Sequence, residues 1–158
     1  MLFLLFQLGN DRYALEASRV VEVVPWLALK RIPQAPKGVA GLFNYRGCPV
    51  PAVDLCELAL GQPARERLST RIIVVNYPDA TGSNRLLGLI AEQATGTLRK
   101  NPQDFIEPSV NSAAAPYLGP VIMDERGVIQ WVREQRLLSE NMRDLLFSEV
   151  TELTHEAH

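Results

Sequence analysis

The side chains best suited to catalysis are scarce in this chain of 158 residues. Its only histidines, His155 and His158, stand in the polar stretch that ends the sequence. The preceding residues therefore offer no imidazole for a Ser–His or Cys–His pair or for a histidine metal site, although carboxylate or lysine chemistry stays open. Two cysteines, Cys48 and Cys56, are too few for a disulfide framework or a four-ligand zinc site. We expect reduced thiols that pack as small apolar residues.

A polar turn offers binding chemistry instead. Asn44, Arg46 and Gly47 fall between two strand-like stretches, residues 39–43 and 48–53. An arginine at a turn can form a bidentate contact with a carboxylate or with the last carbonyls of a helix. Simpler roles stay open: Asn44 can satisfy turn backbone groups, Arg46 can be a solvated surface residue, and Gly47 can supply turn geometry.

Composition indicates an ordinary globular chain. Hydrophobic residues make up 47% and charged residues 22%, with a net charge of −2. The length suits one compact unit or two small lobes with a shared core. No apolar run approaches the ~20 residues of a membrane helix, so we expect no direct membrane insertion. Residues 3–8 are apolar, but they lack a preceding basic residue and a cleavage site, which favours a buried strand over a signal peptide.

Short β segments separated by turn signals dominate the chain. Two helices interrupt them: one is capped by Asp54 and ended by Gly61, and the other is C-terminal. The second follows Ser139 as its cap, with an apolar stripe of Leu138, Met142, Leu145 and Leu146 that we expect to cover the core. Pro49 and Pro51 cannot donate to a ladder, which predicts an edge or bulged strand. The pattern predicts a mainly β fold, as a small barrel or sandwich, from strands at 3–8, 13–15, 20–24, 39–43, 48–53, 71–77, 86–90, 95–98, 118–123 and 128–132.

Weak internal similarity suggests two related lobes. Residues 12–15 resemble residues 85–89, and Gly41 with Arg46–Gly47 resembles Gly119 with Arg126–Gly127. The offsets are similar, as a duplication predicts, although chance similarity between hairpins is the alternative.

Residues 39–55 carry a family resemblance. They read apolar-x-Gly-apolar-apolar-Asn-x-Arg-Gly-x-x-x-Pro-apolar-apolar-Asp-Leu, which resembles the signature of the CheW-like chemosensory adaptor family. Residues 32–36 resemble the family's approach to this signature, and the similarity extends over residues 1–146.

The resemblance implies two packed five-stranded SH3-like β-barrel lobes with a short mid-chain helix and a C-terminal helix. It assigns residues 1–150 to the domain and leaves residues 151–158 as a polar tail, which we expect to be disordered. It also implies a non-catalytic adaptor with no cofactor and no metal, located in the cytoplasm and recruited to membrane-associated receptor arrays. Its partners would be the cytoplasmic tip of a methyl-accepting chemoreceptor and the regulatory domain of a CheA-type histidine kinase. By resemblance, the receptor-binding residues are Gly41, Leu42, Asn44, Arg46 and Gly47, whereas kinase-binding residues stay unassigned.

The chain departs from the family pattern near its end. The last strand usually leads to Leu-Asp before the terminal helix, whereas residues 128–134 lack this acidic cap and contain Trp131. Residues 100–116 are also unusually rich in proline. These departures suggest a specialised pathway, such as surface sensing or second-messenger synthesis.

Two other function classes are less well supported by the sequence. A small barrel could bind nucleic acid through a basic edge of Lys30, Arg31, Lys37 and Arg46. An acidic pI near 5.7 and 7% aromatic residues oppose this, so we expect no nucleic-acid partner. An enzyme is also disfavoured, because the sequence has no glycine-rich phosphate loop and no nucleophile elbow.

Overall fold

The computed structural model describes residues 1–108 and 115–156, with side chains through residue 148. Within these residues the fold is mainly β, as predicted. The helices are α1 (Leu55–Leu60) and α2 (Glu140–Glu156), with short 3-10 turns η1 (Ala17–Arg19), η2 (Pro102–Asp104) and η3 (Glu134–Arg136). The strands are β1 (Leu2–Leu8), β2 (Asp11–Glu16), β3 (Val20–Pro25), β4 (Val39–Tyr45), β5 (Cys48–Asp54), β6 (Arg71–Pro78), β7 (Asn84–Arg99), β8 (Leu118–Asp124) and β9 (Gly127–Val132).

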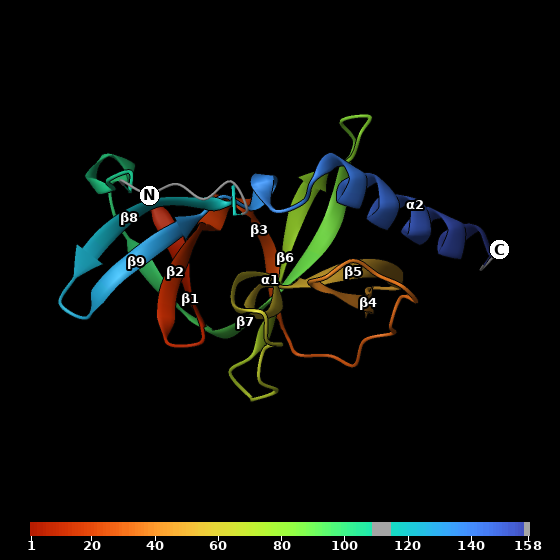
Figure 1. Ribbon diagram of the computed structural model, residues 1–158, viewed down its shortest axis with the longest axis horizontal. Coiled ribbons are helices and arrows are strands. Elements are labelled where there is room, and N and C mark those ends of the chain that lie inside the picture. The colour runs from red at the N-terminus through yellow and green to blue at the C-terminus, as the bar shows by residue number, and fades with distance from the viewer. Residues whose placement is uncertain (109–114, 157–158) are drawn as a thin grey trace.

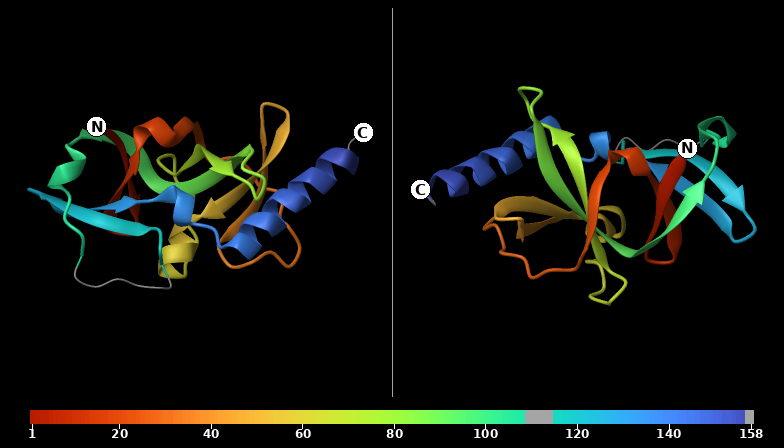
Figure 2. Two further views of the ribbon diagram at one scale, coloured as in Figure 1. Left: turned by 90° about the horizontal axis from the view of Figure 1, so that it is seen from above. Right: turned by 180° about the vertical axis from the view of Figure 1, so that it is seen from behind.

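The strands form two lobes that share β7 (Figure 1). The first lobe contains β3, β6, the first half of β7, β5 and β4, and the second contains the rest of β7, β1, β2, β9 and β8. The chain begins in the second lobe, passes to the first through η1 and returns within β7. The lobes are therefore interlocked along the chain, and Figure 2 shows them side by side from two further directions.

Both lobes have the same hydrogen-bonding plan. Each lobe contains an antiparallel hairpin, β4–β5 in the first and β8–β9 in the second. The second strand of each hairpin also pairs in parallel with another strand, β5 with β7 and β9 with β2. One bridge closes each lobe: Lys30 joins Leu42 in the first, and Ile106 joins Val121 in the second. This shared plan is what an internal duplication predicts.

The strand pairing shifts the alignment of the two hairpin turns by one residue from the alignment predicted by internal sequence similarity. Leu42 corresponds to Val121 and Tyr45 to Asp124, so Arg46 corresponds to Glu125 and not to Arg126. Matching by residue type was misleading here, because strand pairing and loop length fix the register.

Three buried clusters hold the molecule together. Each lobe has a small interior, around Phe43 in the first and Phe3 in the second. The largest cluster combines residues of both lobes, including Leu15 of β2 and Leu89 of β7. Most of the apolar core therefore lies between the lobes and holds them against each other.

The predicted cap residues are confirmed. Asp54 precedes α1, and its Oδ1 accepts hydrogen bonds from the amides of Cys56 (2.9 Å) and Glu57 (3.2 Å). Gly61 ends α1 in the left-handed conformation, with φ of 78°. Ser139 Oγ accepts from the amide of Met142 (3.2 Å) at the start of α2. These caps could be predicted from the sequence because each cap residue lies within three residues of its hydrogen-bond partner.

Three local predictions need correction. Cys56 is buried, but Cys48 is exposed because it adjoins the β4–β5 turn. The strand with the two prolines is an edge strand only in part: Pro49 and Pro51 pair with β4 alone, as predicted, whereas Ala52–Asp54 also pair with β7. Its ladder with β4 contains a register shift between Val39 and Gly41. Leu145 is 45% exposed, whereas Phe147 is buried. The prediction failed here because the helical spacing of apolar residues does not show which side of the stripe packs against the rest of the protein.

Helix α2 runs outward from the first lobe (Figure 1). It continues through Glu156, so six residues of the expected disordered tail are helical, and residues 157–158 lie outside the described residues. Within the described part of the chain, no helix is long and apolar enough to cross a membrane.

Candidate functional site

The β4–β5 turn is a tight two-residue loop made by Arg46 and Gly47. Tyr45 pairs with Cys48, and both loop residues have positive φ, 51° for Arg46 and 86° for Gly47. Two successive left-handed residues form the type I′ turn that suits a twisted hairpin. Asn44 Oδ1 accepts a hydrogen bond from the Gly47 amide (2.8 Å), so its predicted structural role is confirmed.

The Arg46 side chain is held over a partly buried cluster. Its Nη2 lies 3.2 Å from Glu22 Oε2, and its guanidinium carbon lies 5.3 Å from the centre of the Tyr45 ring. The Tyr45 hydroxyl donates to the same oxygen of Glu22, which raises the Tyr45 pKa. Yet 74% of the Arg46 side chain is exposed. Strand β3 thus positions a guanidinium that keeps most of its surface open to a partner.

Gly41 and Leu42 do not share this surface. Both are buried, and Leu42 forms the Lys30 bridge that closes the first lobe. Gly41 has φ of 145°, and a Cβ there would collide with the Lys30 carbonyl oxygen. Only glycine permits that approach. Of the five residues expected to bind a receptor, three therefore lie together at the exposed turn and two support the hairpin from within.

The second hairpin also ends in a charged loop, Glu125 and Arg126, but apolar side chains are exposed beside it. Met123 and Val128 pair across the β8–β9 hairpin and are 71% and 52% exposed. Ile106, which bridges Val121 two residues before Met123, is 70% exposed. We call Ile106, Met123 and Val128 the apolar strip. An exposed strip of this kind is typical of an interaction site. The sequence prediction missed it, although strand alternation would have placed Met123 and Val128 outside.

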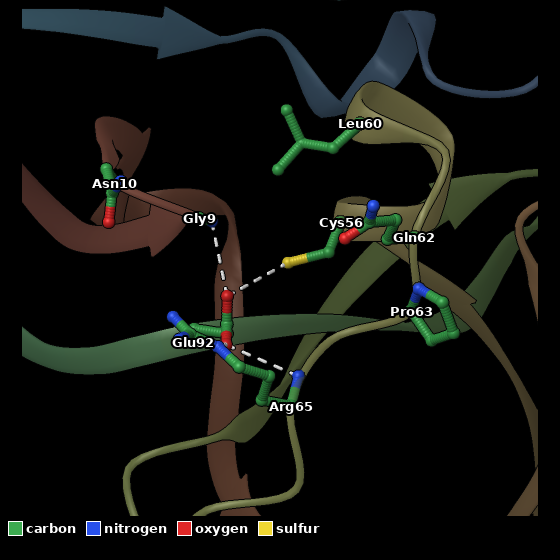
Figure 3. A pocket seen from close by; sticks show the side chains of 8 residues that line it. All are labelled: Gly9, Asn10, Cys56, Leu60, Gln62, Pro63, Arg65 and Glu92. Carbon is green, nitrogen blue, oxygen red and sulfur yellow. Dashed lines mark hydrogen bonds and ion pairs between the residues drawn. The ribbon is translucent and has the colours of Figure 1, made fainter.

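A small hollow of about 240 Å³ lies between α1 and the β1–β2 turn (Figure 3). Its floor is Glu92, a residue of β7 that is only 5% exposed. Glu92 Oε1 accepts from the Gly9 amide (3.2 Å) and the Cys56 thiol (3.6 Å), and Oε2 lies 2.8 Å from Arg65 Nε.

The electrostatics of this hollow indicate a structural role. Burial raises the pKa of Glu92, but the hydrogen bonds from Arg65 and Gly9 outweigh it, and the pKa lies below its usual value. Burial, with Glu92 nearby, raises the pKa of Cys56 to about 12, so its thiol stays protonated and unreactive at neutral pH. In the part of the chain that the structure describes, no cluster of three or more His, Cys, Asp or Glu side chains could hold a metal.

The departures noted at the chain's end have structural counterparts. Arg133 corresponds to the cap residue Asp54, and it forms no side-chain cap, so only the 3-10 turn η3 follows. Trp131 corresponds to Ala52 and packs on Phe3 and Phe105, with ring centres 4.9 and 5.1 Å away. The tryptophan thus fills the interior of the second lobe, where it is partly buried.

The fold defines a class of protein: two SH3-like β lobes, interlocked through a shared strand, with an exposed arginine at the turn of one and an apolar strip beside the turn of the other. Within that class, the chain belongs to the CheW-like domain family, whose family model matches residues 2–142. The chain is accordingly a CheW-like chemotaxis adaptor, of the kind that links chemoreceptors to a CheA-type kinase.

Individual relatives agree with this assignment. The chain is 30% identical over 144 residues to the chemotaxis protein CheW of Klebsiella aerogenes, across 89% of this chain and 83% of that protein. It is 28% identical over 113 residues to protein FrzA of Myxococcus xanthus, across 72% and 68%. The crystal structure of the scaffolding protein TtCheW from Thermoanaerobacter tengcongensis superposes with a TM-score of 0.78 at 22% identity, over 92% of each chain. That match confirms the two-lobed fold.

Proposed function

We propose that this adaptor binds the cytoplasmic tip of a methyl-accepting chemoreceptor at the β4–β5 turn, without catalysing a reaction. Asn44, Arg46 and Gly47 make the contact, and Gly41 and Leu42 keep the hairpin in place. The observation that carries the proposal is the Arg46 guanidinium, anchored by Glu22 yet 74% exposed. A receptor tip is a helical hairpin, and a fixed guanidinium suits its carboxylates or its C-terminal carbonyls.

Charge reversal at Arg46 tests this directly. Arg46→Glu should remain folded, because the side chain is largely exposed, and should lose at least roughly tenfold in receptor affinity, which is about 1.4 kcal/mol. Arg126→Glu is the matched control, since Arg126 is an exposed arginine in the β8–β9 turn. Binding to receptor-tip particles can be measured by sedimentation. Equal affinity of a folded Arg46→Glu variant and the control would remove Arg46 from the site.

We infer that the regulatory domain of a CheA-type kinase binds the apolar strip. An adaptor must hold both partners at once, and the strip lies on the other lobe from the turn. Ile106, Met123 and Val128 are exposed by 52% or more, and a partner that buries them gains hydrophobic free energy. The kinase is the better occupant because a receptor helix already has a charged site on the first lobe.

Polar replacement of the strip tests the second surface. The double variant Met123→Ser/Val128→Thr should weaken binding to the isolated kinase regulatory domain and leave receptor binding unchanged, as calorimetry with each partner would show. Loss of receptor binding alone would reverse the assignment of the two surfaces.

We also propose that the adaptor is recruited to membrane-associated arrays in the cytoplasm and serves a specialised chemosensory pathway. Support comes from Trp131 and Arg133, which make the end of the second lobe unlike its counterpart. Mass spectrometry of proteins captured from the native cell tests this. Recovery of only the flagellar receptor and kinase pair would contradict it.

A further inference from the structure

Two buried carboxylates stand where the chain joins the lobes. At the first crossing, Arg19 of η1 has its Nε 2.6 Å from Glu134 Oε1. At the second crossing, within β7, Glu92 pairs with Arg65 and also accepts the Gly9 amide of the other lobe. The side chains of Glu134 and Glu92 are only 2% and 7% exposed. At each crossing, therefore, a buried carboxylate forms an ion pair with an arginine.

Glu134 is unexpected at its position. It directly follows Arg133, the counterpart of Asp54, and so corresponds to Leu55 of the first lobe, which is 1% exposed. Leucine is the natural occupant of such a buried position, since a buried charge costs free energy unless it is paired. The second lobe has instead a carboxylate whose partner, Arg19, comes from the segment that enters the first lobe.

The neighbourhood of Glu134 adds a second tie between the lobes. The Tyr77 hydroxyl of β6 donates to the carbonyl of Gln135 (3.0 Å) and accepts from the amide of Leu138 (3.2 Å). The segment that leaves the second lobe is thus held by the first lobe on one side and by Arg19 on the other.

Apolar burial alone does not fix an angle. The inter-lobe core contributes most of the contact, but hydrophobic attraction is not directional. Charge-assisted hydrogen bonds depend on geometry, and buried ionic groups can supply conformational specificity even where they add little stability.

We propose that Glu92 and Glu134 are positioning residues, which form two clasps with Arg65 and Arg19 and so fix the angle between the lobes. The clasps act in the isolated protein. One consequence rests on the proposed function: because the two docking surfaces lie on different lobes, the clasps would set the angle between receptor and kinase.

Pulsed electron spin resonance on the free adaptor tests the proposal. One spin label is attached to native Cys48 on the first lobe, and the other to a Met123→Cys substitution on the second. Both sites are exposed, and Cys56 is buried and protonated, so it should not react. The parent protein should give one narrow distribution of distances between the labels.

Two variants break the clasps in different ways. Arg19→Met/Glu134→Leu replaces one clasp with apolar side chains, as at Leu55, and should leave thermal unfolding cooperative at an unchanged or higher midpoint. Glu92→Gln keeps the size of the other side chain but removes its charge. In each variant the distance distribution should broaden or gain a second maximum. Glu107→Gln is the control, because its partner Arg133 belongs to the same lobe, and its distribution should match the parent.

A distribution as narrow as the parent's in both folded clasp variants would overturn the proposal. Should Arg19→Met/Glu134→Leu fail to fold, Glu92→Gln decides the matter in the same way. Because no partner is present, the result does not depend on whether the receptor and kinase surfaces are correctly assigned.

Discussion

The β4–β5 and β8–β9 hairpins share one backbone plan and differ in what they present. Each ends in a two-residue loop and is closed by one bridge. Both loops are charged, but where the first hairpin has Asn44 paired with Pro49 beside its loop, the second has the exposed apolar pair Met123 and Val128. Duplicated backbone thus supplies two surfaces that differ in the apolar area they expose, which is what a protein with two different partners requires.

The interiors behind the hairpins differ in a compensating way. Phe43 in the first lobe corresponds to Ile122 in the second, while its neighbour Gly88 corresponds to Ala14. A Cβ at Gly88 would lie 2.5 Å from Phe43 Cε1. The same Cβ would lie 2.8 Å from Ile72 Cγ2, so the large ring and Ile72 together require the glycine. In the second lobe, the smaller isoleucine accompanies alanine.

The largest expected effect separates two glycines of the first hairpin. Gly41→Ala should destabilise the protein by on the order of 2–6 kcal/mol, because backbone strain adds to a collision with the Lys30 carbonyl. Gly47→Ala has positive φ but open space around it, so it should lose only about 1–2 kcal/mol. Chemical denaturation of both variants measures the difference. Equal losses would show that the close approach of the Lys30 carbonyl to Gly41 does not require glycine.

A smaller effect tests the compensation between the interiors. Gly88→Ala should destabilise the protein by about 1–3 kcal/mol through overpacking against Phe43 and Ile72. Adding Phe43→Ile recreates the Ile122/Ala14 pair of the second lobe. The double variant should be more stable than the sum of the single variants predicts, with a coupling of about 0.5–3 kcal/mol. Additive losses in a double-mutant cycle would mean that the two interiors are not equivalent.

Sequence reasoning succeeded where the information is local. The residue types in 39–55 predicted the hairpin and the Asp54 cap and left a turn contact open for Asn44; the partners all lie within a few residues. Sequence reasoning missed Glu92, whose donors Gly9 and Arg65 are distant in the chain and meet only after the lobes pack.

The clasp of Arg19 with Glu134 was missed for the same reason, since no local pattern pairs residues so far apart. The prediction of which side chains are buried failed where periodicity is compatible with either burial or exposure, as at Leu145 and Cys48. What could not be predicted from the sequence is therefore the set of contacts between the lobes, which form only when the lobes pack.

The smallest expected effect concerns how the two turns are anchored. In the first, the neutral Asn44 side chain accepts the Gly47 amide. In the second, Asp124 Oδ1 accepts the Arg126 amide (2.8 Å), and the carboxylate pairs with Arg12. The hydrogen bonds from Arg12 hold the pKa of Asp124 well below its usual value of 3.8.

This difference makes the Asp124 anchor sensitive to acid, whereas the Asn44 anchor is not. A carboxylate with a lowered folded pKa contributes its full stability above its unfolded pKa and loses it as the pH falls through the folded value. The stability gap between the parent protein and Asp124→Asn should therefore be constant from pH 7 to about pH 5 and shrink steadily below pH 4. The gap for Asn44→Ala should not change over the same range, because no titrating group is removed. Urea denaturation at a series of pH values measures both gaps, and a pH-independent gap for Asp124→Asn would show that Arg12 does not anchor the second turn through charge.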